Sequence, residues 1–242
     1  MTNRRDFSLI LACFNELDVF DSSVERIVDT LNYSNLNYEI IFVDDKSSDN
    51  TRQLIAKACK KYPHCSALYH GKNQGRGKTV SDGFIKAMGQ VVGFIDIDCE
   101  VGPEYIPQLV SLILERKADV AIGKRIYRSS PGSLIREILS RGYQWLSDFL
   151  IGTGGLDTET GYKFFRRSSV LPLLSKTVHS GWFWDTEIMV RAKRAGLTIC
   201  EVPVLFLRRF DKHSSVNIIR DTAEYLVNLW SFRKLLAREH LL

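Results

Sequence analysis

The chain has 242 residues, of which 45% are hydrophobic and 25% charged. This composition is typical of a globular protein and excludes a disordered, collagen-like or coiled-coil chain. The longest uncharged run covers residues 105–114, whereas a membrane-spanning helix needs about 18 apolar residues or more. We therefore expect no membrane-spanning segment.

Charge is divided unevenly between the two halves of the chain. Residues 1–115 hold 12 Lys+Arg and 16 Asp+Glu, a net charge of −4, whereas residues 116–242 hold 21 and 12, a net charge of +9. A basic half is typical of a protein whose partner carries phosphate or presents an anionic surface, although solvated helix faces also produce such an asymmetry.

The cysteines and histidines carry no metal or disulfide pattern. Five cysteines are scattered without a CxxC pair, and no two of the five histidines are four residues apart. A disulfide framework, a zinc site and a histidine metal site on one helix face are therefore not expected. The pattern predicts a reduced, cytoplasmic protein.

In the first half, short apolar runs alternate with amphipathic stretches. In chain order they predict a strand at 7–12, a helix at 22–31, a strand at 38–43, a helix at 50–62, a strand at 65–69, a helix at 79–88, a strand at 90–95, a helix at 103–115 and a strand at 119–122. Ser22 and Glu25 have the spacing of a capping box. Continuous apolar strands separated by helices predict an α/β fold with a mostly parallel sheet and helices on both faces.

The regular alternation ends after Gly123. The second half predicts a helix at 134–151, a loop at 152–155, a strand at 162–165, a helix at 185–194, a strand at 198–206 and a last helix at 218–237. Because no proline- or serine-rich linker separates the halves, we expect one domain over 1–242 with an elaborated C-terminal half. Its expected parts are the residues at 1–115, the residues at 116–216 and an amphipathic helix at 217–242.

Acidic residues follow two of the predicted strands. Asp44 and Asp45 end the second strand, and Asp96 and Asp98, followed by Glu100, end the fourth. Aspartate also ends strands because it favours turns, but two such pairs at one sheet edge weaken that alternative. Carboxylates placed in this way predict a site for Mg²⁺ or Mn²⁺ with a bound diphosphate.

A glycine-rich segment, GKNQGRGKT at 71–79, lies between these acidic pairs. It is not a P-loop, because the first glycine of that motif would fall at Lys72. Arg76, Lys78 and the backbone amides of the segment can nevertheless lie near a phosphate. A flexible turn into a helix is the alternative.

Several motifs occur along the chain in a fixed order. They are ACFNE at 12–16, VDDKS at 43–47, NQG at 73–75 and GFIKAMGQVVGFIDID at 83–98. Together they resemble the family 2 inverting glycosyltransferases, which implies the Rossmann-like GT-A fold. The later segments, GKR at 123–125, TGYKFFRR at 160–167, DTE at 185–187 and EVP at 201–203, resemble the branch that transfers a hexose to dolichyl or polyprenyl phosphate.

This resemblance implies a nucleotide-sugar-binding half at 1–115, an acceptor-binding half at 116–216 and a role for each matching residue. The nucleotide sugar would be bound by Ala12, Phe14, Asn15, Glu16, Asp44, Asp45, Lys78, Asp96, Ile97 and Asp98. The divalent metal would be held by Asp96, Asp98 and Glu100. The acceptor phosphate would contact Arg125, Arg136 and Ser214, and Arg209 would take part in catalysis. The chain departs from the family pattern at Ala12, Lys46, Glu100, Lys212 and Ser215.

The implied reaction is a metal-dependent transfer of a hexose from a nucleotide-diphosphate sugar, with inversion at the anomeric carbon. A hydroxyl acceptor needs a carboxylate base, for which Asp185 is the first candidate and Glu187 the second, although Asp185 can instead be a helix N-cap. A phosphate acceptor is already anionic and needs no base. We expect a polyprenyl or dolichyl phosphate as acceptor, with a sugar or other hydroxyl as the alternative.

Two other classes of function stay open. A sugar-1-phosphate nucleotidyltransferase shares a parallel sheet with metal carboxylates, but it usually has a glycine-rich loop after the first strand. A non-catalytic nucleotide-sugar binding module is the other. The last helix can lie on a membrane surface or pack against the domain, so we expect a cytoplasmic protein with a peripheral membrane contact or a membrane protein subunit as partner, and no nucleic acid.

Overall fold

The computed structural model describes residues 5–127, 142, 145–207 and 218–239. Seven strands form one sheet: β1 (Phe7–Cys13), β2 (Tyr38–Asp44), β3 (Cys65–Tyr69), β4 (Val91–Ile95), β5 (Val120–Tyr127), β6 (Tyr162–Arg166) and β7 (Ile199–Phe206). Their order is β3-β2-β1-β4-β6-β5-β7, and only β6 runs antiparallel to its neighbours. The predicted mostly parallel sheet is confirmed.

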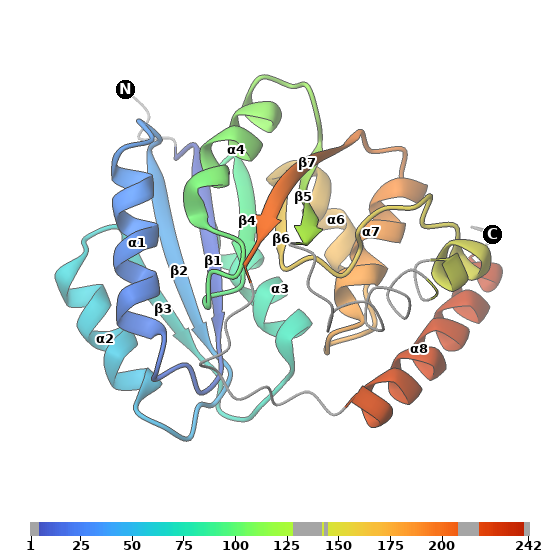
Figure 1. The fold of residues 1–242 in the computed structure, drawn as a ribbon, viewed down its shortest axis with the longest axis horizontal. Helices are drawn as coiled ribbons and strands as arrows, with labels where there is room; N and C mark the ends of the chain where they lie inside the picture. Colours follow the sequence, from blue (N-terminus) through green and yellow to red (C-terminus); the bar gives the residue numbers. More distant parts are fainter. Residues whose placement is uncertain (1–4, 128–141, 143–144, 208–217, 240–242) are drawn as a thin grey trace.

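Helices cover both faces of this sheet (Figure 1). They are α1 (Phe20–Asn32), α2 (Thr51–Lys61), α3 (Arg76–Lys86), α4 (Ile106–Leu114), α6 (Arg167–Leu174), α7 (Trp184–Arg194) and α8 (Ile218–Arg238), with a 3₁₀ turn at Pro103–Tyr105. Residues 145–151 are also helical. None of the described helices combines the length and the apolar character that crossing a bilayer requires.

Two hydrophobic clusters fill the space on either side of the sheet. Leu9 belongs to the cluster that packs against α1, α2 and α4, and Ile10 belongs to the cluster that packs against α3, α6 and α7. Neighbouring residues of β1 enter different clusters because successive side chains of a strand point to opposite faces. A third cluster joins Ile151 and α7 to the buried face of α8.

Three helix predictions need correction. The capping box of Ser22 and Glu25 is wrong, because α1 begins earlier and the Ser22 hydroxyl donates to the carbonyl of Val19 over 3.1 Å. Helix α3 begins three residues earlier than predicted, directly after Gly75, whose φ of 92° suits glycine. Helix α6 was not predicted, because it is eight residues long and contains Pro172.

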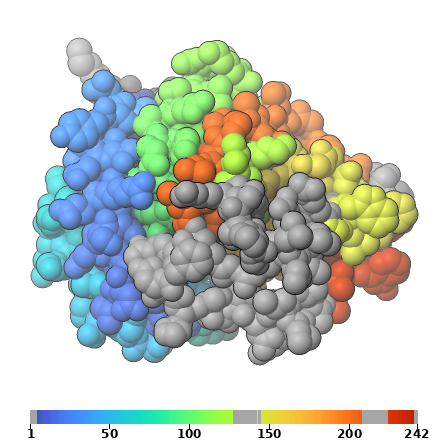
Figure 2. Space-filling view, viewed as in Figure 1, coloured from blue at the N-terminus to red at the C-terminus, as the bar shows by residue number. Residues whose placement is uncertain are grey.

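Strands from both halves of the chain share this one sheet. Strand β6 inserts between β4 and β5, so the first and second halves meet in the middle of the sheet. Figure 2 shows α1 and α2 at one end of the visible face and residues of α8 at the other. The carboxyl ends of β1, β2 and β4 lie at one edge, and the predicted donor residues follow these strands.

Candidate functional site

Asp44 ends β2 beside Cys13, the last residue of β1. Its side chain is fully buried, and its Oδ1 accepts a hydrogen bond of 3.1 Å from the amide of Ser47. Its Oδ2 makes no hydrogen bond, although Nε of Arg52 lies 3.1 Å away. A buried carboxylate oxygen without a hydrogen-bond donor is costly, so this oxygen is suited to accept a hydrogen bond from a ligand.

The carboxylate of Asp45 holds the glycine-rich segment in place. It accepts hydrogen bonds of 2.8 Å from the amides of Gln74 and Gly75, and Nδ1 of His70 lies 2.8 Å from its Oδ1. The other ring nitrogen of His70, Nε2, lies 3.2 Å from the carboxylate of Asp82. The sequence predicts Asp45 as a nucleoside ligand, but in the structure its carboxylate anchors the loop that leads to α3.

The loop after β1 lies against the loop after β2. Asn15 has a φ of 57°, and its side-chain oxygen accepts a 2.8 Å hydrogen bond from the amide of Ser48. The amide of Glu16 donates to the hydroxyl of Thr51 over 2.8 Å. Phe14 is 47% exposed at this edge. The predicted donor residues at 12–16 and 44–45 are therefore neighbours, as the sequence implied.

A chain of opposite charges crosses the same edge from β4 to α7. Nη2 of Arg76 donates to Oδ1 of Asp96 over 2.6 Å, and its Nη1 donates to Asp185. Nζ of Lys163 completes the chain with a 2.7 Å contact to the other oxygen of Asp185. The order is Asp96, Arg76, Asp185, Lys163, and the four residues come from four different elements or their ends.

Two glycines allow this approach. A Cβ at position 77 would lie 2.2 Å from Cβ of Trp184, so Gly77 lets the start of α3 lie directly against α7. A Cβ at position 161 would lie 1.7 Å from Oδ2 of Asp96, so Gly161 leaves the space that this carboxylate uses. Replacing either glycine would separate the charged side chains that the chain of contacts joins.

The net pKa shifts of the two buried cations have opposite directions. Desolvation lowers the pKa of Lys163, which is fully buried, and Asp185 offsets only part of that effect. For Arg76, desolvation also acts to lower the pKa, but Asp185 and Asp96 outweigh it and raise the pKa above its ordinary value. Arg76 therefore stays charged beside the two carboxylates.

The predicted metal ligands do not form a closed set. Asp98 accepts a 3.3 Å hydrogen bond from the amide of Glu100, and Asp96 faces Arg76. Over the described ranges, no three histidine, cysteine or acidic side chains gather closely enough to hold a metal ion. Because Mg²⁺ is usually bound by one or two carboxylates, water and substrate phosphates, Asp96 and Asp98 suit a metal that arrives with a diphosphate.

Glu187, the second candidate base, lies in a buried ion network. Its carboxylate accepts from the amide of His179 over 2.9 Å and from Nε of Arg191 over 2.8 Å, and it is fully buried. Burial acts to raise the pKa of Glu187, but the hydrogen bonds from His179 and Arg191 outweigh it and lower the pKa. These contacts fix α7 and give Glu187 no access to an acceptor, which argues against its role as a base.

Asp185 is not a helix N-cap. It lies in the first turn of α7, after the N-cap residue Phe183, and its carboxylate oxygens are used by Arg76 and Lys163. Its position still suits a negative charge, because the helix dipole is positive at that end.

The predicted acceptor residues are described only in part. Arg125, on β5, donates from Nε and Nη2 to Asp157 over 2.9 and 2.8 Å. Lys78, which was predicted to bind the nucleotide sugar, pairs with Asp82 one turn further along α3. Arg136, Arg209 and Ser214 lie outside the described residues, as does most of the predicted helix at 134–151.

The sequence analysis assigned no role in the site to Lys163, His70 or Asp157. Lys163 left a signal, because it is the one charge inside the run YKFF at 162–165 and a charge in a buried strand needs a partner. His70 and Asp157 carried no such signal, since each pairs with a residue 25 or 32 positions away.

The comparison with family models decides the family. The model described as glycosyl transferase family 2 matches residues 8–173, which is more than half of the chain. This chain belongs to glycosyl transferase family 2. The match covers the carboxylates at 44–45 and 96–98 and Lys163, and it ends before α7 and Asp185.

Curated relatives fit this family. Glycosyltransferase AglD from Haloferax volcanii is 27% identical over 89% of this chain and 35% of its own length. Dolichyl-phosphate beta-glucosyltransferase from Saccharomyces cerevisiae is 30% identical over 69% of this chain and 56% of its own length. The chain thus spans about a third to a little over half of these two family 2 relatives.

Solved structures share the GT-A fold of this family 2 chain. Glucosyl-3-phosphoglycerate synthase from Mycobacterium tuberculosis, in complex with Mn²⁺, UDP and glucosyl-3-phosphoglycerate, aligns with a TM-score of 0.70 and 19% identity over 95% of this chain and 80% of its own. Staphylococcus aureus TarS 1-349 in complex with UDP-GlcNAc aligns with a TM-score of 0.57 and 20% identity over 93% and 65%.

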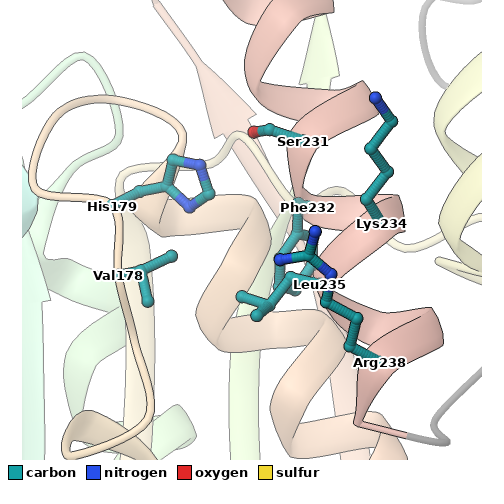
Figure 3. Close-up of a pocket in the computed structure, with 7 residues that line it drawn as sticks. All are labelled: Val178, His179, Ser231, Phe232, Lys234, Leu235 and Arg238. Atoms are coloured by element: carbon teal, nitrogen blue, oxygen red, sulfur yellow. The ribbon is translucent and has the colours of Figure 1, made fainter.

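A groove of about 320 Å³ lies between residues 178–179 and α8, away from the carboxylates at the ends of β2 and β4 (Figure 3). It is lined by Val178, His179, Ser231, Phe232, Lys234, Leu235 and Arg238. Figure 3 shows Lys234 directed away from His179, so the polar groups do not converge on one point. None of the predicted site residues of this family 2 chain lines the groove.

Proposed function

We propose that this chain transfers a hexose from a nucleoside-diphosphate sugar to a polyprenyl phosphate, with inversion at the anomeric carbon and with Mg²⁺ or Mn²⁺ as cofactor. The observation that carries the proposal is the row of carboxylates at the ends of β2 and β4, with Arg76 beside it. The names of the dolichyl-phosphate glucosyltransferase relatives and the Mn²⁺ and UDP of the structural neighbour support it.

The donor would lie along this edge of the sheet. Oδ2 of buried Asp44, which receives no hydrogen bond from the described residues, would accept a hydrogen bond from the nucleoside, and Asp96 and Asp98 would face the diphosphate. A divalent cation bound there neutralises charge on the leaving diphosphate. Arg76 supplies a second positive group at the same place, and guanidinium binds phosphate oxygens in a bidentate manner.

The state of Asp185 favours a phosphate acceptor over a hydroxyl. A general base must be able to take a proton from the acceptor, but both carboxylate oxygens of Asp185 are engaged by Arg76 and Lys163. An acceptor phosphate attacks without a base. The role that these contacts support for Asp185 is to position the two cations.

The lipid acceptor requires a membrane contact, for which the outer face of α8 is the candidate. Leu226, Val227 and Trp230 are 43%, 67% and 54% exposed, and Lys234 and Arg238 lie on the same helix. An amphipathic helix with basic groups and an exposed tryptophan is typical of an interfacial helix. The exposed, stacked rings of Trp145 and Phe149 offer a second apolar surface.

The test is a transfer assay with radiolabelled nucleoside-diphosphate hexoses, Mn²⁺ and either short-chain polyprenyl phosphate or the matching polyprenol. We expect label in the lipid phosphate product, no product from the polyprenol, and an inverted anomeric configuration by NMR. Product from the polyprenol or from a sugar acceptor alone would contradict the phosphate acceptor. In a separate reaction, formation of a nucleotide sugar and pyrophosphate from a sugar 1-phosphate and a nucleoside triphosphate would indicate a nucleotidyltransferase.

A further inference from the structure

The guanidinium of Arg76 lies where the predicted metal ligands begin. It bridges Asp96 and Asp185 and lies 5.1 Å from the ring centroids of both Phe94 and Trp182. Its side chain is only 11% exposed, whereas that of Asp96 is 47% exposed. A protein cation therefore already neutralises a carboxylate that solvent can reach.

Arg76 holds one of the two carboxylate oxygens of Asp96. Oδ1 accepts the 2.6 Å hydrogen bond from Arg76, and Oδ2 lies over Gly161, where a Cβ would come within 1.7 Å. A metal ion against Oδ1 would lie close to the guanidinium, and two cations at that distance repel each other, so they compete for this oxygen. Arg76 and a divalent cation are therefore alternative partners of this oxygen.

We propose that Arg76 is a positioning residue that occupies Asp96 before the donor binds and exchanges this carboxylate for the diphosphate when the donor brings its divalent cation. This inference rests on the proposed function, because it needs a diphosphate that arrives at Asp96.

The exchange leaves no buried charge without a partner. When Arg76 turns to the diphosphate, Asp185 keeps Nζ of Lys163 at 2.7 Å. The rings of Phe94 and Trp182 continue to border the guanidinium, and the planar group gains phosphate oxygens in the geometry that it binds best. The arrangement therefore has two states that differ in the partner of one side chain.

Coupling between the metal and the nucleotide follows. Without nucleotide, a metal that displaces Arg76 from Asp96 leaves the guanidinium with Asp185 as its carboxylate partner and no phosphate to replace Asp96, so the affinity for the metal is low. With nucleotide, both cations gain partners, and by thermodynamic linkage each ligand strengthens the other by the same factor. We expect a factor of about ten or more, within the range that coupled sites show.

Electron paramagnetic resonance of free Mn²⁺ tests this. We expect weak binding to the unliganded protein and binding at least about tenfold tighter with UDP or GDP present. Arg76→Met, which keeps a long apolar side chain, should bind Mn²⁺ without nucleotide about tenfold or more tightly than the parent, whereas Lys86→Ala, which removes one charge from the far end of α3, should not. Equal nucleotide-free affinities of the Arg76→Met variant and the parent would overturn the proposal.

Fluorescence of Trp182 provides a second measurement that needs no change at Arg76. The ring is 64% exposed beside the guanidinium, so addition of UDP or GDP with Mn²⁺ should change the emission of the parent protein but not that of Trp182→Phe. An unchanged emission in a parent that binds the nucleotide would overturn the exchange. If neither nucleotide binds, the proposed function fails, while the Mn²⁺ affinities without nucleotide still report whether Arg76 occupies Asp96.

Discussion

The two acidic regions of the site are built in different ways. Asp45 is held by backbone amides of Gln74 and Gly75, and Asp44 by the amide of Ser47. Asp96 and Asp185 are instead held by the long side chains of Arg76 and Lys163. Backbone donors fix a carboxylate in one place, whereas a guanidinium can exchange partners. We infer that the region of Asp44 and Asp45 is a rigid binding site for the nucleoside, and that the region of Asp96 and Asp185 is adjustable.

The largest effect on stability is expected when the buried ion pair of the adjustable region, Asp185 with Lys163, is broken. Asp185→Ala leaves the fully buried Lys163 without its carboxylate, which should lower the free energy of unfolding by about 3–5 kcal/mol. Chemical denaturation measures this. The double variant Asp185→Ala, Lys163→Met should regain most of the loss, because no unpaired charge is then buried. A loss of less than about 1 kcal/mol in the single variant would contradict the importance of this pair.

The second largest effect is expected when the space that Gly161 leaves for the Asp96 carboxylate is filled. Gly161→Ala puts a Cβ into the space of the Asp96 carboxylate, so we expect a loss of about 1–3 kcal/mol in stability and weaker Mn²⁺ binding in the presence of nucleotide. Gly181→Ala is the control, because a Cβ there meets no heavy atom within 4 Å. Equal Mn²⁺ affinity in both variants would show that Asp96 does not hold the metal.

In the rigid region, Asp44→Ala should act on donor binding. Loss of a charged hydrogen-bond acceptor corresponds to about 1.5–3 kcal/mol, or roughly a 10- to 100-fold rise in the KM for the nucleotide sugar, with kcat nearly unchanged. Steady-state kinetics of Asp44→Ala beside Glu25→Ala, which removes an exposed carboxylate from α1, measure this. A fall in kcat alone would contradict the assignment of Asp44 to the nucleoside.

The smallest effect is a pH dependence that lies outside both regions. The pKa of Glu187 is lowered in the folded protein, because hydrogen bonds from His179 and Arg191 outweigh its burial. Its contribution to stability is present above its unfolded pKa of about 4.3 and is lost as pH falls through the lower, folded value. Stability measured between about pH 6 and 3 should therefore fall less steeply in Glu187→Gln than in the parent. Parallel curves would show that Glu187 does not contribute in this way.

The contrast between the rigid and the adjustable region also explains which parts of the site the sequence could predict. The sheet, most helix positions and the neighbourhood of residues 12–16 and 44–45 follow from apolar patterns and from the rule that parallel strands end at one edge. The partners of Asp185 depend on how α3, β6 and α7 pack, and Lys163 and Asp185 are 22 residues apart. No local pattern contains such a pairing, so the sequence suggested a base or an N-cap where the structure has an ion-pair chain.

The predicted start of α1 was wrong for a local reason. The spacing of Ser22 and Glu25 fits a capping box, yet α1 already begins at Phe20, whose buried ring packs in the core beneath it. Burial of an aromatic side chain stabilises more than one capping hydrogen bond, so packing rather than the polar signal decided where the helix begins.

The most direct test of the account is calorimetric binding of UDP and GDP, with and without Mn²⁺, to the parent protein and to Asp98→Asn. The account predicts that one of these nucleotides binds and that Mn²⁺ strengthens its binding by about tenfold or more. Asp98→Asn should remove this strengthening. Asp119→Asn, which changes a carboxylate directly before β5 and far from the carboxyl end of β4, should not. Binding that is equally strong without Mn²⁺, or unchanged in Asp98→Asn, would contradict a metal and diphosphate site at the end of β4.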